Sequence, residues 1–206
     1  MKVAPRAARP VRSEAAAATR RGRQALTIDA SGRLAGARFV ASPNCDDRPP
    51  GAEITLLVVH NISLPPNEFG GDDVLRFFSN ELDYSTHSYY EGLREVRVSA
   101  HFFIRRTGEL IQLVPCARRA WHAGASSWRG RDRCNDFSIG VELEGTDTAP
   151  YPAEQYRQLA RLAAALRCRY PIDDVVGHCN IAPGRKTDPG PAFDWTRFRS
   201  LVRRYR

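Results

Sequence analysis

Five histidines are the first residues of this sequence that could do chemistry: His60, His87, His101, His122 and His178. A single histidine is more often a core or surface residue than a ligand. His60 and His178 are better candidates, because each follows a short apolar segment and precedes a loop rich in Gly, Pro or Asn. Asp188 follows His178 by ten residues. Two imidazoles and one carboxylate are the protein ligands of hydrolytic zinc sites that keep a fourth position open. The spacing alone is only suggestive, because no HExxH helix fixes the geometry.

Glu142 and Lys186 are candidates for proton transfer and for charge stabilisation. Glu142 lies in an alternating segment, on the face opposite its apolar residues, where a carboxylate could act as a general base. A solvent-facing strand position, as expected for Glu144, is the simpler alternative. All 31 basic residues are arginines except Lys2 and Lys186. A lysine beside a candidate zinc ligand suggests a need for a compact ammonium group, although chance explains it equally well.

These residues must be positioned by strands and helices that the sequence pattern predicts. Residues 54–59 are typical of a buried strand, and residues 137–143 alternate as a half-buried strand does. A hairpin is predicted over 101–104 and 109–114, with its turn at Gly108. A brief strand is expected at 175–176. Helices are predicted from Asp72 through Leu82, between Pro152 and Pro171, and from about Asp194. Strands interspersed with helices indicate one domain of the α/β or α+β class.

The charge of the chain is concentrated at its ends. Of the net +8 over 206 residues, residues 1–24 carry +6 and residues 197–206 carry +5, which leaves −3 elsewhere. Basic ends of this kind are more typical of solvated tails than of a nucleic-acid site. Residues 1–24 lack the apolar core of a secretory signal and are predicted to be a disordered extension, with the folded domain at 25–206.

Two further features of the sequence exclude other classes of protein. No apolar run approaches the ~20 residues that span a bilayer. The five cysteines are odd in number and form no CxxC pair, which argues against a secreted disulfide scaffold. We therefore expect a cytoplasmic protein with no membrane or nucleic-acid partner.

Five segments resemble one family closely and in order. They are LVVHNISLPP at 57–66, RVSAH at 97–101, AWHAG at 120–124, RCNDFSIGVELEG at 133–145 and GHCNIAPGRKTDPG at 177–190. Together they are similar to the cytoplasmic members of the zinc-dependent N-acetylmuramoyl-L-alanine amidases, a family related to peptidoglycan recognition proteins and T7-type lysozyme. The resemblance runs from about Leu26 to Val202. It implies a single α/β (α+β) domain with a central mixed β-sheet flanked by helices.

The resemblance also implies an activity and a role for each matching residue. The activity is hydrolysis of the amide between (1,6-anhydro-)N-acetylmuramic acid and L-alanine in peptidoglycan recycling, with a possible influence on β-lactamase induction. The enzyme would hold one zinc ion per chain and need no obligate protein partner. The implied zinc ligands are His60, His178 and Asp188, the catalytic residues are Glu142 and Lys186, and the substrate-binding residues are Asn61, Arg97 and Arg133. Arg97 and Arg133 would hold carboxylates of the stem peptide, and the possible cleft wall comprises His101, Trp121 and His122.

Three alternatives from other classes remain. A non-catalytic muropeptide-binding module is disfavoured because the full metal set is present. An exported amidase acting on intact peptidoglycan is disfavoured by the missing export signal. A nucleic-acid-binding protein is disfavoured by the −3 charge of the body of the chain.

Overall fold

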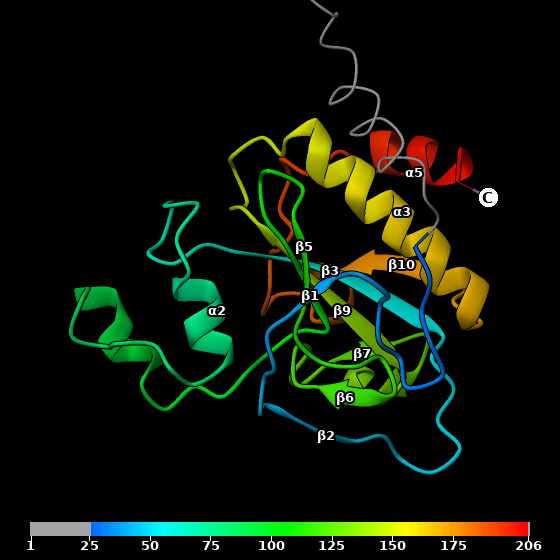
Figure 1. Ribbon diagram of the computed structural model, residues 1–206, viewed down its shortest axis with the longest axis horizontal. Helices are drawn as coiled ribbons and strands as arrows, with labels where there is room; N and C mark the ends of the chain where they lie inside the picture. Colours follow the sequence, from blue (N-terminus) through cyan, green and yellow to red (C-terminus); the bar gives the residue numbers. More distant parts are fainter. Residues whose placement is uncertain (1–25, 206) are drawn as a thin grey trace, which may run out of the picture.

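A mixed six-stranded sheet forms the centre of the protein, which the computed structural model describes over residues 26–205. The predicted extension at 1–24 therefore lies outside the described residues. The strand order is β1-β5-β4-β9-β3-β10, and only β4 and β5 pair antiparallel (Figure 1). The strands are β1 (Arg38–Phe39), β3 (Leu56–Ile62), β4 (Phe102–Ile104), β5 (Leu110–Gln112), β9 (Ser138–Glu144) and β10 (Asp174–Gly177). The expected hairpin is confirmed, and its turn contains Gly108 at φ +86°, a backbone conformation that favours glycine.

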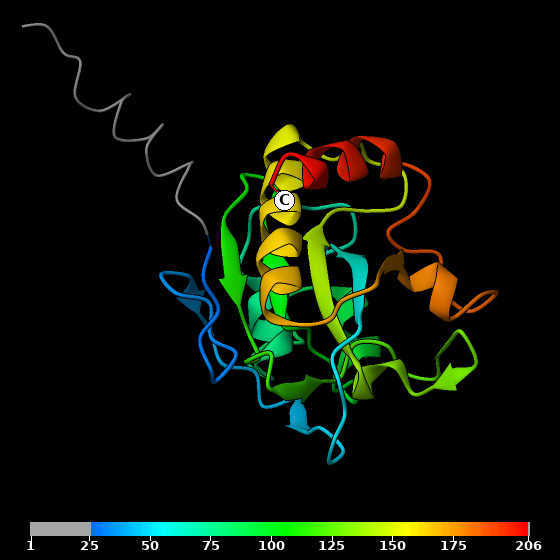
Figure 2. The ribbon, with the colours of Figure 1, turned by 90° about the vertical axis from the view of Figure 1, so that its right-hand side faces the viewer.

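Two helices, α3 (Ala153–Arg169) and α5 (Trp195–Arg203), cover one face of the sheet (Figures 1 and 2). Both were predicted from the spacing of apolar residues. Asp194 caps α5 by accepting a hydrogen bond from the backbone N–H of Arg197. The apolar stripe of α3 packs on the sheet, and each large side chain so buried contributes about 1.5–3 kcal/mol. Its buried members include Tyr156, Leu159, Ala163 and Leu166.

The opposite face of the sheet carries shorter elements. They are α2 (Asp73–Phe78), the 3₁₀ helices η1 (Ser88–Leu93) and η2 (Cys134–Asp136), α4 (His178–Ile181), and two small ribbons, β2 (Cys45–Asp47) with β6 (Arg118–Ala120) and β7 (Ser127–Trp128) with β8 (Arg131–Asp132). Helix α2 is shorter than predicted and ends at Phe78, although Leu82 beyond it is also buried in the same apolar cluster. This face leaves room for a site between α2 and α4.

Strand β3 continues further than its apolar residues indicate. It runs through His60 and Asn61 to Ile62, because its parallel pairing with β9 continues as far as Glu144. His60 is therefore a residue of the strand, whereas the sequence placed it at the end.

The expectation that Glu144 faces solvent is wrong. Its side chain is buried and accepts hydrogen bonds from the backbone N–H groups of Gly70 (2.5 Å) and Arg106 (2.9 Å). The loop after β3 and the β4–β5 turn thus cover the end of β9.

All five cysteines are free thiols. No helix within residues 26–205 is both long enough and apolar enough to cross a bilayer.

Candidate active site

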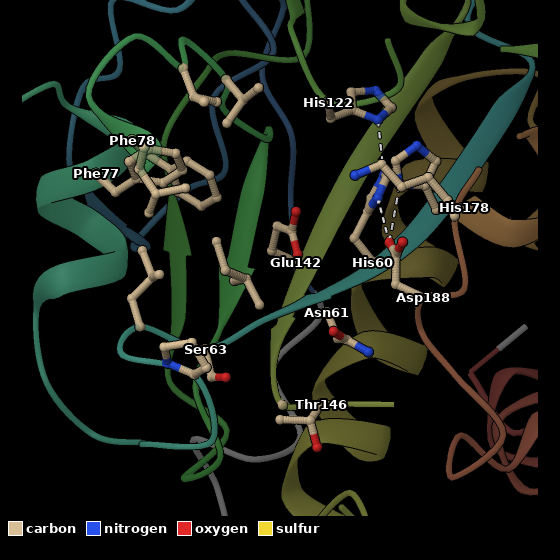
Figure 3. Close-up of a pocket in the computed structure, with 18 of the residues that line it drawn as sticks. His60, Asn61, Ser63, Phe77, Phe78, His122, Glu142, Thr146, His178 and Asp188 are labelled. Carbon is tan, nitrogen blue, oxygen red and sulfur yellow. Dashed lines mark hydrogen bonds and ion pairs between the residues drawn. The ribbon is translucent and has the colours of Figure 1, made fainter. Parts of the chain in front are cut away.

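Three residues from distant parts of the chain bring their ligand atoms together on the open face of the sheet. His60 comes from β3, His178 is the first residue of α4, and Asp188 lies in the loop that follows α4. The Nδ1 atoms of His60 and His178 lie 3.0 Å and 3.1 Å from the same oxygen, Oδ2 of Asp188 (Figure 3). All three ligand atoms lie within 4.8 Å of one another. This cluster could hold a metal ion.

The hydrogen bonds around His178 suit a metal ligand. Its Nε2 lies 3.2 Å from the backbone carbonyl oxygen of Ala123. A carbonyl oxygen only accepts, so Nε2 carries the proton of the neutral ring and Nδ1 presents a lone pair to the cluster. Burial lowers the pKa of His60 to about 4, which keeps that ring neutral as well. Two neutral imidazoles and a carboxylate are the ligand types that zinc prefers.

Glu142 lies beside this cluster with an oxygen that has no partner. It pairs in register with His60 in the parallel ladder of β9 and β3, so both side chains leave the same face of the sheet. The Glu142 side chain is buried, and its Oε2 forms no hydrogen bond with any described residue. Burial raises the pKa of Glu142 well above its usual value, the Asp188 charge adds to this, and the Lys186 ammonium opposes it. A carboxylate in this environment takes up a proton more readily than an exposed one does, as a general base must.

A cavity of about 460 Å³ connects these groups, a size within the range of small-molecule sites. One side carries the polar residues His60, His178 and Asp188, and the exposed Lys186 also lines it. The other side is apolar and includes Phe77 and Phe78 of α2, with Glu142 lying between the two sides (Figure 3). The cavity can therefore take a ligand with one reactive polar group and one apolar part.

Comparison with known proteins decides the family. The family described as N-acetylmuramoyl-L-alanine amidase matches residues 50–191, a range that contains the histidine–aspartate cluster, Glu142 and Lys186. This chain belongs to that family. It is similar to the 1,6-anhydro-N-acetylmuramyl-L-alanine amidase AmpD of Citrobacter freundii, with 59% identity over 173 residues that make up 83% of this chain and 92% of the relative.

Two solved structures support the assignment of fold and family. A selenomethionine derivative of AmpD matches with a TM-score of 0.83 and 59% identity over 85% of this chain and 98% of that one. The amidase AmiD of E. coli, solved with the substrate anhydro-N-acetylmuramic acid-L-Ala-D-gamma-Glu-L-Lys, matches with a TM-score of 0.54 and 30% identity over 84% of this chain and 65% of that one. The mixed sheet with flanking helices is thus the fold that the sequence predicted.

The three residues that the sequence assigned to substrate binding lie in different places in this amidase. Asn61 lines the cavity, and its Nδ2 donates to Oδ1 of Asp147 at 2.8 Å. Arg97 is exposed outside the cavity lining, and its Nη1 donates to the backbone carbonyls of Arg94 (2.7 Å) and Val96 (3.1 Å). Arg133 also lies outside the lining. Its side chain is 70% exposed, and its Nε lies 3.2 Å from a carboxylate oxygen of Asp136.

Of the three expected wall residues, only His122 lines the cavity. His122 also contacts His60. His101 is fully buried and is not among the lining residues. Its Nδ1 accepts from the backbone N–H of Gly140 at 3.0 Å. Trp121 is partly buried and does not line the cavity either.

Sequence reasoning missed several residues of this amidase site. Leu93, Val96 and Phe77 form part of the apolar wall but carry no motif signal, because apolar residues near a short helix are typical of core. Ser138, whose hydroxyl lies 3.1 Å from Nε2 of His122, was assigned no role from the sequence. The Ala123 carbonyl has no side-chain signal at all.

Proposed function

We propose that this amidase uses zinc to hydrolyse the amide between the lactyl group of 1,6-anhydro-N-acetylmuramic acid and the L-alanine of the stem peptide. The observation that carries the proposal is the convergence of His60, His178 and Asp188 on one point beside the unpartnered carboxylate oxygen of Glu142. The substrate class is supported by the similarity to AmpD and by the AmiD complex with an anhydro-muropeptide.

In the proposed mechanism Glu142 moves the proton. Zinc held by the cluster would polarise the scissile carbonyl and lower the pKa of a water molecule to about 7. Glu142 would accept a proton from the attacking water and deliver it to the amine of alanine as the C–N bond breaks. Its burial favours the protonated form, so the proton is held until the leaving group takes it.

The remaining residues would bind charge on the substrate. The Lys186 ammonium would face the oxygen that becomes negative in the tetrahedral intermediate. Asn61 would contact the stem peptide from the cavity wall. Arg97 and Arg133 would bind carboxylates of the stem peptide beyond the cavity, since the planar guanidinium group suits bidentate contact with a carboxylate. Both residues are exposed, so each guanidinium group could exchange its present partners for a carboxylate of a ligand that extends from the cavity.

In the cell, the enzyme would act in the cytoplasm on soluble products of wall turnover. It would need no membrane, nucleic-acid or obligate protein partner. Clearing anhydro-muropeptides would influence β-lactamase induction where these compounds act as the signal.

Mass spectrometry of the products tests the proposal directly. A purified anhydro-muropeptide is incubated with zinc-loaded protein and with protein treated with a chelator. We expect free stem peptide and free anhydro-sugar only with zinc. Binding without cleavage in the zinc-loaded sample would favour a recognition module, and cleavage of intact peptidoglycan at an equal rate would favour an exported wall amidase.

A further inference from the structure

A chain of three hydrogen bonds runs away from the cluster behind His60. The Nε2 atom of His60 lies 3.0 Å from Nδ1 of His122, and Nε2 of His122 lies 3.1 Å from Oγ of Ser138. The Ser138 hydroxyl lies 2.5 Å from the backbone carbonyl oxygen of Cys134. The three side chains are buried, so each of these polar atoms depends on its neighbour in the chain.

The last acceptor, the carbonyl oxygen of Cys134, fixes the direction in which these hydrogen bonds donate. The carbonyl oxygen of Cys134 only accepts, so the Ser138 hydroxyl proton points to it and the Ser138 oxygen is left to accept from Nε2–H of His122. A neutral imidazole has one N–H, so Nδ1 of His122 carries a lone pair and accepts from Nε2–H of His60. The Nδ1 atom of His60 then carries a lone pair, directed at Asp188.

The Nδ1 atom of His60 lies 3.0 Å from Oδ2 of Asp188. A lone pair on this nitrogen and the negative carboxylate oxygen repel each other unless a cation lies between them. The opposite direction would place a proton on Nδ1 of His60, shared with Asp188, and would compete with a metal ion. With the opposite direction, the Ser138 hydroxyl would donate to His122 and no longer to the carbonyl of Cys134. That carbonyl would then keep only the longer hydrogen bond from the backbone N–H of Phe137, at 3.3 Å. The short bond from Ser138 favours the first direction.

We propose that Ser138 and His122 are positioning residues that set the tautomer of His60, so that its Nδ1 lone pair is presented to the metal ion. A single hydrogen bond to the Ala123 carbonyl sets the same tautomer in His178. In His60 the tautomer is set through two side chains, those of His122 and Ser138. Gly140 makes the arrangement possible, because a Cβ there would lie 2.4 Å from Cγ of His122. The inference rests on the zinc site of the proposed function.

The variant S138A tests the inference, because it removes one hydroxyl and leaves every proposed ligand in place. S42A is the matched control, since Ser42 is another buried serine whose hydroxyl donates to a carbonyl, that of Phe78, outside the cluster. Zinc affinity is measured by competition with a chelator, and the histidine tautomers are assigned from long-range ¹⁵N–¹H spectra of the zinc-loaded protein. Thermal unfolding checks that both variants fold.

We expect the wild-type protein to show His60 and His122 both protonated at Nε2. The S138A variant should bind zinc about 10–100-fold more weakly, the usual effect of removing an outer-sphere partner of a metal ligand, while S42A binds as the wild type does. A proton on Nδ1 of His122 in the zinc-loaded wild type, or unchanged zinc affinity in S138A, would overturn the inference. Failure of the wild-type protein itself to bind zinc would instead overturn the proposed function on which the inference rests.

Discussion

Glu142 is the direct neighbour of His60 across the parallel pairing of β9 with β3. Both strands are central in the sheet, so the proposed proton-transfer group and a proposed metal ligand are held by the same hydrogen-bonded ladder. Groups on rigid strands keep their separation better than groups on loops do. The geometry of the reacting centre is therefore built into the most buried part of the fold.

Replacing Glu142 by glutamine should abolish hydrolysis and leave zinc binding intact. The amide keeps the shape of the carboxylate but cannot accept the proton, and loss of a general base typically costs about 10²–10⁴-fold in rate. Turnover of an anhydro-muropeptide and zinc content are measured together. E53Q, at an exposed glutamate, is the control and should behave as the wild type. Unchanged turnover in E142Q would rule out the assignment of the base.

Removing the Lys186 ammonium should slow turnover without changing zinc affinity. Loss of one group that stabilises the oxyanion typically costs about 10²–10³-fold in kcat. K186A is compared with K186R, which restores the charge in a larger planar group and should recover only part of the rate. A rise in KM with unchanged kcat in K186A would mean that the lysine binds substrate and does not stabilise the transition state.

Arg97 and Arg133 should affect how strongly the stem peptide binds. A hydrogen bond to a charged group contributes about 1.5–3 kcal/mol, so R97A and R133A should each lower kcat/KM by about 10–100-fold. Zinc affinity should not change. R38A, at an exposed arginine paired with Glu109, is the control.

The same two variants can be tested against a second substrate. If these arginines bind stem-peptide carboxylates, a substrate with those carboxylates amidated should be cleaved equally by the wild type, R97A and R133A. A loss that persists with the amidated substrate would contradict the assignment.

Mild acid should destabilise the protein through His101. Burial, and then the Arg48 charge, lower the pKa of His101 well below its usual value of 6.5. The unfolded chain therefore binds a proton at His101 that the folded chain does not, so the stabilising effect is complete above about pH 6.5 and is lost progressively as the pH falls below it. One such group changes the free energy of unfolding by at most about 1.4 kcal/mol per pH unit.

Urea unfolding of chelator-treated protein between pH 7.5 and 5.5 measures this effect. We expect a shallower pH dependence in H101Q, whose amide oxygen can still accept from the N–H of Gly140. Parallel pH profiles for H101Q and the wild type would show that His101 is not the group responsible.

Local patterns in the sequence determined much of the fold. The apolar spacing between Pro152 and Pro171 predicted α3, and the alternation along 137–143 placed Glu142 opposite the apolar residues of its strand. These features depend on residues close together in the chain, where side-chain periodicity reports burial directly. The motifs around His60, His178 and Asp188 identified the family for the same reason, because each is a short run of residues.

Only the tertiary structure decided how these pieces meet. Asp188 contacts His60 across 128 residues of sequence, and His122 reaches His60 across 62. The burial of Glu144 follows from a loop that folds over the end of β9, and no local pattern shows it. Such contacts depend on which strands are neighbours in the sheet and on how loops cross them. The motifs could therefore name candidate ligands, but only the packed chain shows the hydrogen bonds that orient them.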